Sequence, residues 1–512
     1  MLMTHNNKPS LINILKTNNP NKKAIIVPNE DSFTYSELTK NVNKLTKQLI
    51  EFGIKKNDRV AIYLTNKPET IIIFLAISEI ATAAPLNPAY TASEVQFYME
   101  DINAKYLITS EEPKYKEAFK GCPSNAHIIT INYNNNEFCL IQNDNLKNKS
   151  IEKNSSKNNN SDDVALILHT SGTTSRPKRV PLSHKNIYIS IENISESYNL
   201  TSKDISLCIM PLFHIHGLVA STLSTLFTGG TIILPEKFNA LNFWEIIRSY
   251  KITWVSAVPA IHQTALTRIK TNSNPKEYTK NLRFIRSCSS PLSAQTMLEM
   301  EKILNIPVLE AYGMTEAAHQ MSSNPFPPDK RIPGTVGKGT NVDIAIMDNN
   351  DNLLSNGQQG EIVIKGENVI HGYEDNPEAN ASSFSKGWFR TGDEGIIDEE
   401  GYIRIVGRIK ELINKGGEKI SPIEIDETLL LHPAVTEAVA FAIPHKTYGE
   451  EPSAAVVIKS PITEKDLIKH CKEKLAAFKC PRSIKIVDSI PRTATGKIQR
   501  RIVAEQFSKS SE

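Results

Sequence analysis

The sequence predicts an α/β protein: a large N-terminal domain of parallel-rich sheets with a β subdomain, followed by a small α+β C-terminal domain. Strands and helices alternate through most of the chain, and closely spaced β segments with Asn and Gly turns appear after Asn341. The length of 512 residues corresponds to about three domains at roughly 150 residues each. With 40% hydrophobic and 22% charged residues, the chain can bury a sizeable core.

Composition excludes several classes of protein. The 59 basic and 56 acidic residues leave a net charge of +3, which argues against a nucleic-acid partner. The six cysteines are scattered without a CxxC pair, as is typical of a reducing compartment rather than a zinc ribbon or a disulfide framework. The apolar run Ile71–Ile77 is far shorter than the ~20 residues of a membrane span. We expect a cytoplasmic protein without a membrane span, present as a monomer or homodimer.

Local patterns predict the first elements. Thr34 and Glu37 have capping-box spacing, which indicates the start of a helix. A strand with alternating apolar residues follows near Val60, and an apolar helix starts at about Pro68. The Asn/Lys/Ser-rich stretch from Asn143 to Asp163 is interpreted as a surface linker. The apolar side chains that recur at helical spacing after Glu37 are Leu38, Val42, Leu45 and Leu49.

Short apolar runs further along the chain predict buried strands, and the last hundred residues read as a separate unit. We place the boundary at Lys410, which gives domains of 1–409 and 410–512. One helix there is expected to carry Leu467, Cys471, Leu475 and Phe478 on a single face, and a final helix to cover 497–507. The predicted strands lie within 164–169, 205–210, 231–234, 253–258, 282–287, 308–311, 435–443, 453–458 and 483–487.

The strongest local signal is HTSGTTSRPKRV, from His169 to Val180. An apolar strand enters a loop of small hydroxyl residues with one glycine, and Lys178 follows. Backbone N–H groups, hydroxyls and an ammonium in such a loop suit phosphate oxygens. The Walker A pattern is absent, so P-loop ATPase chemistry is not expected. Taken alone, the loop is equally well explained as an ordinary polar turn.

Further motifs follow in a fixed order: YGMTE (312–316), WFRTGD (388–393), GRIKELINKGGEKISPIEI (407–425) and PRTATGK (491–497). With the phosphate loop, they make the chain resemble the adenylate-forming superfamily from about Thr34 to Phe507, and within it the oxalate–CoA ligases. The resemblance implies an ATP-dependent acid–thiol ligase that forms an acyl-adenylate and then an acyl-CoA. It also implies ATP, Mg²⁺ and coenzyme A as cofactors and a small carboxylic acid as substrate.

The resemblance assigns roles to individual residues. Lys497 would bridge the substrate carboxylate and the α-phosphate, Thr315 would contact that phosphate, and Glu316 would bind Mg²⁺. Tyr312 would line the adenine site, and Asp393 and Arg408 would hold the ribose. Singly, Asp393 is more often a turn residue, Tyr312 could be a core aromatic, and Glu316 and Lys497 could be solvated charges. Only their joint occurrence favours the functional interpretation. The full nucleotide-binding set is Thr170, Ser171, Gly172, Thr173, Thr174, Lys178, Tyr312, Gly313, Asp393 and Arg408.

The C-terminal domain is expected to be mobile, as in the family, with Lys410 as its hinge. Rotation would withdraw Lys497 and bring Lys415, Gly416 and Gly417 to the site as the coenzyme A channel. The two glycines are equally well explained as a simple β-turn. Basic residues such as Lys479 or Lys485 are candidates for the coenzyme A phosphates, and the sequence does not choose among them.

The acid pocket is expected near PLFHIHG (211–217), SCSSPL (287–292) and EAAHQM (316–321). His214, also counted among the catalytic candidates, would line it with Ser289, Ser290 and His319. These polar side chains suit a short acid that ends in an anion, and oxalate is favoured. An alkyl tail would leave them unpaired at about 1–3 kcal/mol each.

Alternatives stay open. The histidines are equally well explained as packed, hydrogen-bonded core residues. A 4-coumarate-like or medium-chain acyl-CoA ligase is the rival enzyme, and a non-catalytic nucleotide-binding module is the rival of another class. Arg179 and Ser175 stand where the family usually has glycine. Either the phosphate loop is slightly reshaped there, or the position that Arg179 occupies needs no unusual backbone conformation.

Overall fold

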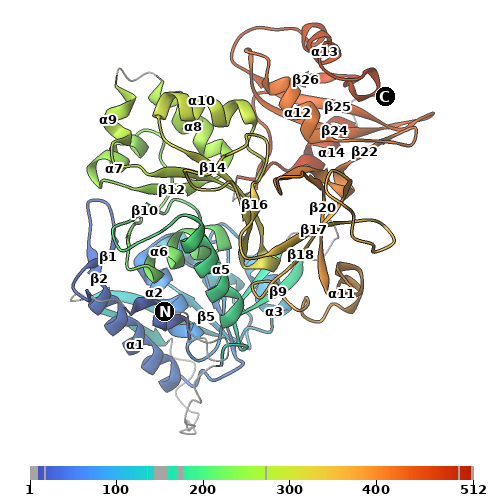
Figure 1. The fold of residues 1–512 in the computed structure, drawn as a ribbon. Helices are drawn as coiled ribbons and strands as arrows, with labels where there is room; N and C mark the ends of the chain where they lie inside the picture. Colours follow the sequence, from blue (N-terminus) through green and yellow to red (C-terminus); the bar gives the residue numbers. More distant parts are fainter. Residues whose placement is uncertain are drawn as a thin grey trace.

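The protein is described here from a computed structural model. Two large sheets with their helices form the N-terminal part, a small β sheet adjoins them, and a further sheet with its helices forms the C-terminal part (Figure 1). The predicted fold class is confirmed. The structure describes residues 10–16, 19–134, 137–142, 160–170, 177–270, 274–493 and 496–508.

The first sheet has seven strands in the order β7-β6-β5-β3-β4-β8-β9. Its inner strands pair in parallel, and β7 and β9 pair antiparallel at the two edges. The predicted capping box at Thr34 and Glu37 starts α1. Most of the predicted linker lies outside the described residues. The elements are η1 (Leu11–Leu15), α1 (Tyr35–Glu51), β3 (Arg59–Ile62), α2 (Pro68–Ser78), β4 (Thr82–Pro85), α3 (Ala92–Asp101), β5 (Tyr106–Thr109), η2 (Pro113–Tyr115), α4 (Lys116–Gly121), β6 (His127–Asn134), β7 (Glu137–Gln142), β8 (Val164–Thr170) and β9 (Lys178–Ser183).

The second sheet has nine strands in the order β16-β15-β14-β13-β12-β10-β11-β1-β2. Its central strands β10 to β14 are the predicted buried apolar runs, and they pair in parallel. The elements are β1 (Lys23–Ile26), β2 (Ser32–Thr34), α5 (His184–Ser197), β10 (Ile205–Leu207), the π-helical η4 (His216–Leu223), α6 (Ser224–Phe227), β11 (Thr231–Ile233), α7 (Phe243–Ser249), β12 (Trp254–Ala257), α8 (Pro259–Ile269), α9 (Pro275–Thr279), β13 (Phe284–Ser287), α10 (Ala294–Leu304), β14 (Val308–Met314), η5 (Thr315–Ala317), β15 (His319–Ser323) and β16 (Lys338–Gly339).

The expected β subdomain is a five-stranded sheet in which β18 and β20 are central and β21 pairs with β20. Its long antiparallel pairs carry the WFRTGD and GRIKEL motifs side by side. The elements are β17 (Asp343–Met347), β18 (Gln359–Lys365), α11 (Pro377–Ser383), β19 (Phe384–Ser385), β20 (Trp388–Ile397), β21 (Ile403–Arg408) and η6 (Ile409–Glu411).

The C-terminal sheet has the order β23-β22-β25-β24, with β26 parallel to β25. Two predicted helices differ. Helix α13 ends at Lys472, and Phe478 belongs to a separate 3-10 turn, Ala477–Lys479. The final helix α14 begins at Arg500. The elements are β22 (Ile413–Lys415), β23 (Glu418–Ile420), α12 (Pro422–Leu430), β24 (Val435–His445), β25 (Gly449–Ile458), α13 (Glu464–Lys472), η7 (Ala477–Lys479), β26 (Ile484–Ile486) and α14 (Arg500–Ser508).

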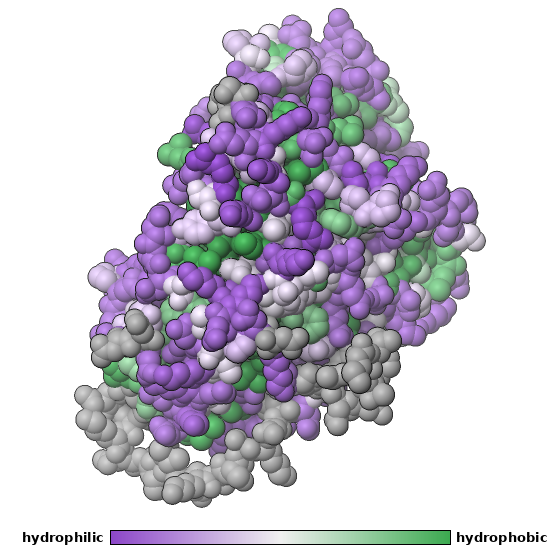
Figure 2. Space-filling model, turned by 60° about the vertical axis from the view of Figure 1, so that its left-hand side comes forward, coloured by the Kyte–Doolittle hydropathy of each residue, from purple (hydrophilic) through white to green (hydrophobic). Residues whose placement is uncertain are grey.

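Lys497 therefore lies in the turn before α14 rather than in the helix. The Thr493 N–H donates to the Lys497 carbonyl, and Gly496 has φ +83°, so the chain folds back on itself there. Among the described residues, no helix is long and apolar enough to cross a membrane. Hydrophilic residues dominate the face shown in Figure 2, and hydrophobic ones form small, separate patches.

Candidate active site

The carboxylate of Asp393 is held in place by side chains from two other motifs. Asp393 of β20 pairs directly with Arg408 of β21, and the Arg408 Nε lies 2.8 Å from the Asp393 Oδ1. The Tyr312 hydroxyl, from the end of β14, donates to Oδ2. Burial and the neighbouring carboxylate raise the pKa of Tyr312 well above its usual value, so it stays a donor. A carboxylate offers about four acceptor positions, which leaves two for a ligand.

Gly313 has a packing role. A Cβ at this position would lie 1.9 Å from the His319 carbonyl oxygen, because β15 crosses close to β14 at a register shift after Tyr312. Glycine alone permits this approach. Gly313 therefore determines where β15, and with it His319, is placed.

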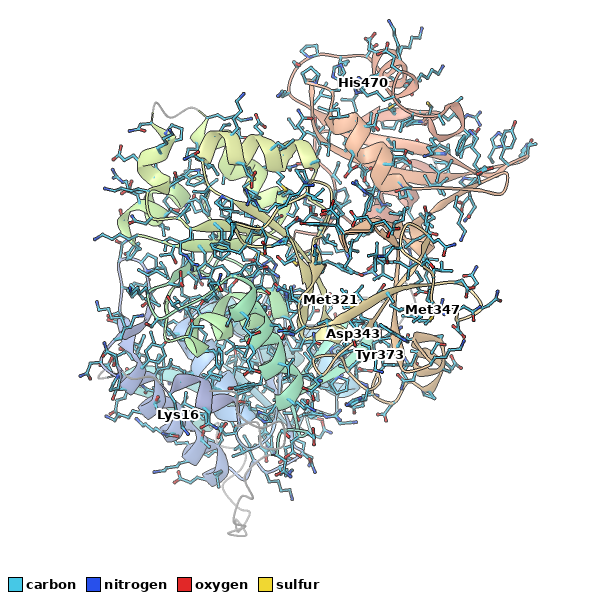
Figure 3. The ribbon with its side chains drawn as sticks, viewed as in Figure 1. Lys16, Met321, Asp343, Met347, Tyr373 and His470 are labelled. Carbon is cyan, nitrogen blue, oxygen red and sulfur yellow. The ribbon has the colours of Figure 1, made fainter. Side chains whose placement is uncertain are left out.

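Glu316 and Lys178 meet at one aromatic ring. Thr315 and Glu316 are buried in η5, and the Tyr373 hydroxyl donates to the Glu316 Oε1 over 2.8 Å. The Lys178 ammonium lies 4.3 Å from the centre of the Tyr373 ring. Figure 3 shows Tyr373 near β18 and β9. Burial lowers the pKa of Lys178, and Lys410 lowers it further while Glu316 opposes them.

The phosphate loop joins two paired strands. Thr170, at the end of β8, stands opposite Lys178, at the start of β9, so the loop leaves and returns at one point. Its predicted residues Ser171, Gly172, Thr173 and Thr174, and also Ser175, lie outside the described residues.

Arg179 fits the strand without strain. Its backbone belongs to β9 and lacks a positive φ, so position 179 does not require glycine here. Its guanidinium donates to the Asp101 carbonyl over 2.8 Å and lies 2.8 Å from the Asp375 Oδ2. The side chain thus attaches the stem of the loop to α3 and to the segment after Tyr373.

A cavity of about 240 Å³ brings residues from distant parts of the chain together. Tyr312, Asp393, Arg408 and Lys497 line it, and burial together with Arg408 lowers the pKa of the Lys497 ammonium. The Lys497 side chain as a whole retains exposed surface, which places it at the rim of the cavity. Ser289, Ser290, Glu310 and Glu427 also line this space.

The predicted acid-pocket histidines are neutral hydrogen-bonding groups. Burial, with the Lys497 ammonium adding to it, lowers the pKa of His214 to about 4, and its Nδ1 accepts from the His216 N–H over 3.2 Å. Burial and Arg286 lower the pKa of His319 well below its usual value. Neither His214 nor His319 is among the residues that line the 240 Å³ cavity, so the structure shows both as buried neutral imidazoles beside it rather than as cations within it.

Behind these histidines lies Arg286, which the sequence motifs did not reveal. It is 0% exposed on β13, and among the described residues it forms no ion pair. Its guanidinium donates to the Tyr198 hydroxyl (2.8 Å), the Ser256 hydroxyl (2.9 Å), the Gln320 Oε1 (3.0 Å) and the His319 Nδ1 (3.3 Å).

His216 was also missed, although it lies in PLFHIHG. It begins the π-helical η4, a type of helix often found at functional sites. Its Nδ1 lies 3.0 Å from the Ser289 hydroxyl and its Nε2 lies 2.7 Å from the Ser256 hydroxyl. The Ser290 hydroxyl is buried and has no hydrogen-bond partner among the residues described.

The predicted coenzyme A residues lie elsewhere. Gly416 and Gly417, with φ of +60° and +94°, form the two-residue turn between β22 and β23. Lys415 lies 3.2 Å from Glu451 and is not among the residues that line either described cavity. Lys410 is exposed on η6.

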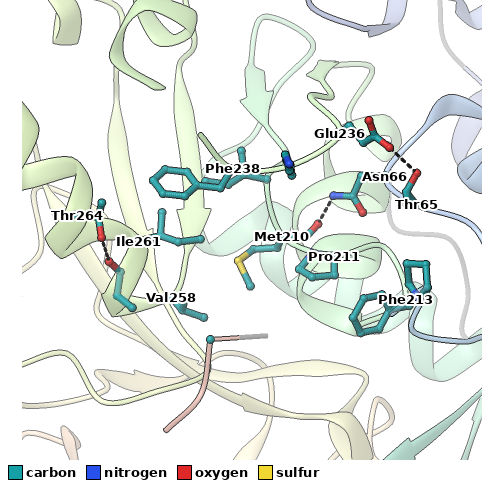
Figure 4. A pocket seen from close by; sticks show the side chains of 15 residues that line it. Thr65, Asn66, Met210, Pro211, Phe213, Glu236, Phe238, Val258, Ile261 and Thr264 are labelled. Atoms are coloured by element: carbon teal, nitrogen blue, oxygen red, sulfur yellow. Dashed lines mark hydrogen bonds between the residues drawn. The ribbon is translucent and has the colours of Figure 1, made fainter. Parts of the chain in front are cut away.

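A second cavity, of about 480 Å³, adjoins the first through Gly496, which lines both. Its wall is mostly apolar and includes Met210, Phe213, Val258 and Ile261 (Figure 4). The Thr65 hydroxyl donates to Glu236 over 3.1 Å at its edge.

Fold and site together define an enzyme that binds adenosine monophosphate, and comparison agrees. Residues 16–374 match the AMP-binding enzyme family, and residues 424–497 match the AMP-binding enzyme C-terminal domain. The chain belongs to this family, as the motif order predicted.

Individual relatives cover almost the whole chain. An oxalate–CoA ligase of Arabidopsis thaliana is 44% identical over 95% of this chain and 96% of its own length. A probable CoA ligase of Humulus lupulus is 46% identical over 95% and 94%. The crystal structure of ATP-bound MatB from Rhodopseudomonas palustris has a TM-score of 0.88 at 30% identity, covering 98% of this chain and 99% of that one.

Proposed function

We propose that this enzyme is an ATP-dependent acid–CoA ligase and that oxalate is the acid it activates. The first half-reaction forms oxalyl-adenylate and pyrophosphate, and the second forms oxalyl-CoA and AMP. One observation carries the proposal: Lys497, the Asp393–Arg408 pair and the Ser289 and Ser290 hydroxyls line one cavity.

The arrangement suits adenylate formation. A carboxylate and an α-phosphate repel each other, and the Lys497 ammonium at the cavity rim offers a charge that attracts both. Asp393, held by Tyr312 and Arg408, keeps acceptor positions for the two ribose hydroxyls. Tyr312 lines the adenine side, while Thr315 and Lys178 contact the phosphates.

The residues present fit Mg²⁺ bound mainly by the nucleotide. Glu316 supplies one buried carboxylate, oriented by Tyr373, which suits an ion that keeps phosphate and water oxygens as its other ligands. Among the described residues, no group of three or more His, Cys, Asp or Glu side chains could hold a metal ion. When bound, the ion neutralises phosphate charge.

The second half-reaction requires another face of the C-terminal domain. Lys410 is the proposed hinge, with domains of 1–409 and 410–512, and it lies between the two segments that match the family. Rotation at Lys410 would move Lys497 out of the active site and bring Gly416 and Gly417 into it. The apolar cavity beside Gly496, of about 480 Å³, is the candidate site for the pantetheine arm of coenzyme A.

Oxalate suits the part of the cavity that Ser289 and Ser290 line, because both side chains are hydroxyls. An alkyl or aryl tail would leave hydroxyls such as that of Ser290, which is buried without a partner among the described residues, unpaired at about 1–3 kcal/mol each. The 44% identity to the Arabidopsis oxalate–CoA ligase supports the same acid.

A panel of acids tests the proposal. AMP release by the purified enzyme with ATP, Mg²⁺ and coenzyme A should be highest with oxalate, and much lower with cinnamates and medium-chain fatty acids. Equal rates across the panel would contradict the choice of oxalate and favour the coumarate-like or fatty-acid alternative. If no acid stimulated ATP–pyrophosphate exchange, the non-catalytic nucleotide-binding module would be the better explanation.

We also propose a cytoplasmic location, supported by the six free cysteines. Thiol-reactive labelling of the protein in intact cells, compared with labelling after lysis, tests it. We predict that the protein is a monomer or a homodimer. Size-exclusion chromatography with light scattering measures this oligomeric state.

A further inference from the structure

A buried positive charge without a counter-charge lies behind the acid pocket. The Arg286 guanidinium donates to four neutral groups, and no carboxylate pairs with it in the part of the chain that the structure describes. Burying an unpaired charge is strongly unfavourable. Its retention points to an anion that arrives from outside the protein.

The guanidinium determines the tautomer of His319. Arginine has no acceptor, so the 3.3 Å contact from the Arg286 Nη2 makes the His319 Nδ1 the acceptor. Burial keeps this imidazole neutral, so its single proton lies on Nε2. His319 thereby becomes a hydrogen-bond donor on the side away from Arg286.

The contact from Arg286 to His319 is one hydrogen-bond relay toward the acid. A second relay from Arg286 runs through Ser256. Its hydroxyl accepts from the Arg286 Nη1 over 2.9 Å and has one proton of its own, which can go to the His216 Nε2 over 2.7 Å. Neutral His216 then carries its proton on Nδ1 and donates to the Ser289 hydroxyl over 3.0 Å. The Ser289 proton is left to point to a ligand in the cavity that Ser289 lines.

Backbone strain marks the two residues at which the relays end. Ser289 has φ +72° and His319 has φ +123°, both unusual for residues other than glycine. Such conformations cluster at ligand sites, where the surrounding structure maintains them. Both residues are thus held in place by more than side-chain packing.

We propose that Arg286 is the positioning residue that makes the acid pocket specific for a dianionic acid: its charge orients the two relays so that His319 and Ser289 both donate to the carboxylate that does not react. This inference rests on the proposed function. Lys497 attracts the carboxylate that reacts. Arg286 matches the charge of the other carboxylate, through His319 in one relay and through Ser256, His216 and Ser289 in the other. A monocarboxylic acid would use the first cation and leave the second unmatched.

Oxalate and oxamate form a matched pair of substrates, because oxamate carries a neutral amide in place of one carboxylate. Acid-dependent ATP–pyrophosphate exchange with both acids gives the ratio of their kcat/KM values. In Arg286→Gln, we expect the preference for oxalate to fall at least tenfold, mainly through a higher KM for oxalate. Arg286→Lys should restore part of it. Arg283→Gln is the control, since Arg283 pairs with Asp204 outside the pocket and the ratio should not change.

A second measurement does not depend on activity. Nitrogen-15 shifts of labelled histidine, assigned with His319→Gln, should show the His319 proton on Nε2 in the wild-type enzyme without acid. If Arg286→Gln does not fold, Ser256→Ala interrupts one relay and should lower the oxalate/oxamate ratio by a smaller factor.

The outcomes separate the two proposals. An unchanged ratio in a folded Arg286→Gln or Ser256→Ala variant, or a proton on the His319 Nδ1, overturns the role of Arg286. A wild-type enzyme that activates other acids but not oxalate overturns the choice of oxalate, while the tautomer measurement still tests how Arg286 orients His319.

Discussion

The change Lys497→Ala removes the ammonium that we place between the substrate carboxylate and the α-phosphate. At about 4 Å and an effective dielectric constant of about 20, one ammonium–anion contact is worth about 4 kcal/mol. Lys497 keeps exposed surface, so water screens it and about half of that value is expected for each anion. The sum over both anions, about 4 kcal/mol, corresponds to roughly a thousandfold lower rate of adenylate formation.

Acid-dependent ATP–pyrophosphate exchange measures this step alone. Lys474→Ala is the matched control, because Lys474 is exposed on the same domain and lines neither described cavity. In contrast to exchange, thioester formation from synthetic oxalyl-adenylate and coenzyme A should stay near the wild-type rate in Lys497→Ala. If the variant kept more than about a tenth of the wild-type exchange rate, the proposed role of the ammonium would be refuted.

The same ammonium predicts a pH dependence. Burial and Arg408 lower the pKa of Lys497 from its usual 10.5. The group is charged below its pKa, so exchange should decline on the alkaline side at a lower pH than an ordinary lysine would give. If the exchange rate declined only near pH 10.5, the usual pKa of lysine, the lowered pKa of Lys497 would be contradicted.

Three further changes test other parts of the structure. Gly313→Ala places a Cβ against the His319 carbonyl, so we expect a loss of about 1–3 kcal/mol in urea unfolding and a higher KM for oxalate than for ATP. Tyr373→Phe removes the hydrogen bond to Glu316, worth about 1 kcal/mol, and should raise the Mg²⁺ concentration for half-maximal exchange several-fold. Burial lowers the pKa of His184 to about 4, so the folded state resists its protonation and stability should fall by about 3 kcal/mol from pH 6.5 to pH 4. Urea midpoints of His184→Gln should depend less on pH over that interval.

The parts of the fold that the sequence predicted are those determined by short-range chemistry. The capping box at Thr34 and Glu37 needs only residues within one helical turn, and the structure has it at that position. The end of α13 depended on contacts that no local pattern contains. Leu475 and Phe478 continue the apolar spacing, but the regular helix ends at Lys472 and Phe478 lies in a separate 3-10 turn.

The residues of the candidate site were likewise predicted only where a local motif contains them. Asp393 and Arg408 were found because each belongs to a motif, and the structure pairs them across two neighbouring strands. Arg286 belongs to no motif, and its partners come from the C-cap of α5, from β12 and from β15, far apart in the sequence. One signal was present: an arginine inside an apolar run of a central parallel strand, where both faces are normally buried.

The cavity beside Lys497 has walls from both the large N-terminal part and the C-terminal domain: Glu310 stands on β14 and Glu427 on α12. A compound that filled this cavity and formed hydrogen bonds with both carboxyl groups would hold the C-terminal domain in the orientation seen here. Such a compound would halt transfer to the thiol, because that half-reaction requires the C-terminal domain to rotate. An inhibitor of this kind would therefore arrest the enzyme with its reactive intermediate trapped, without resembling any of its substrates.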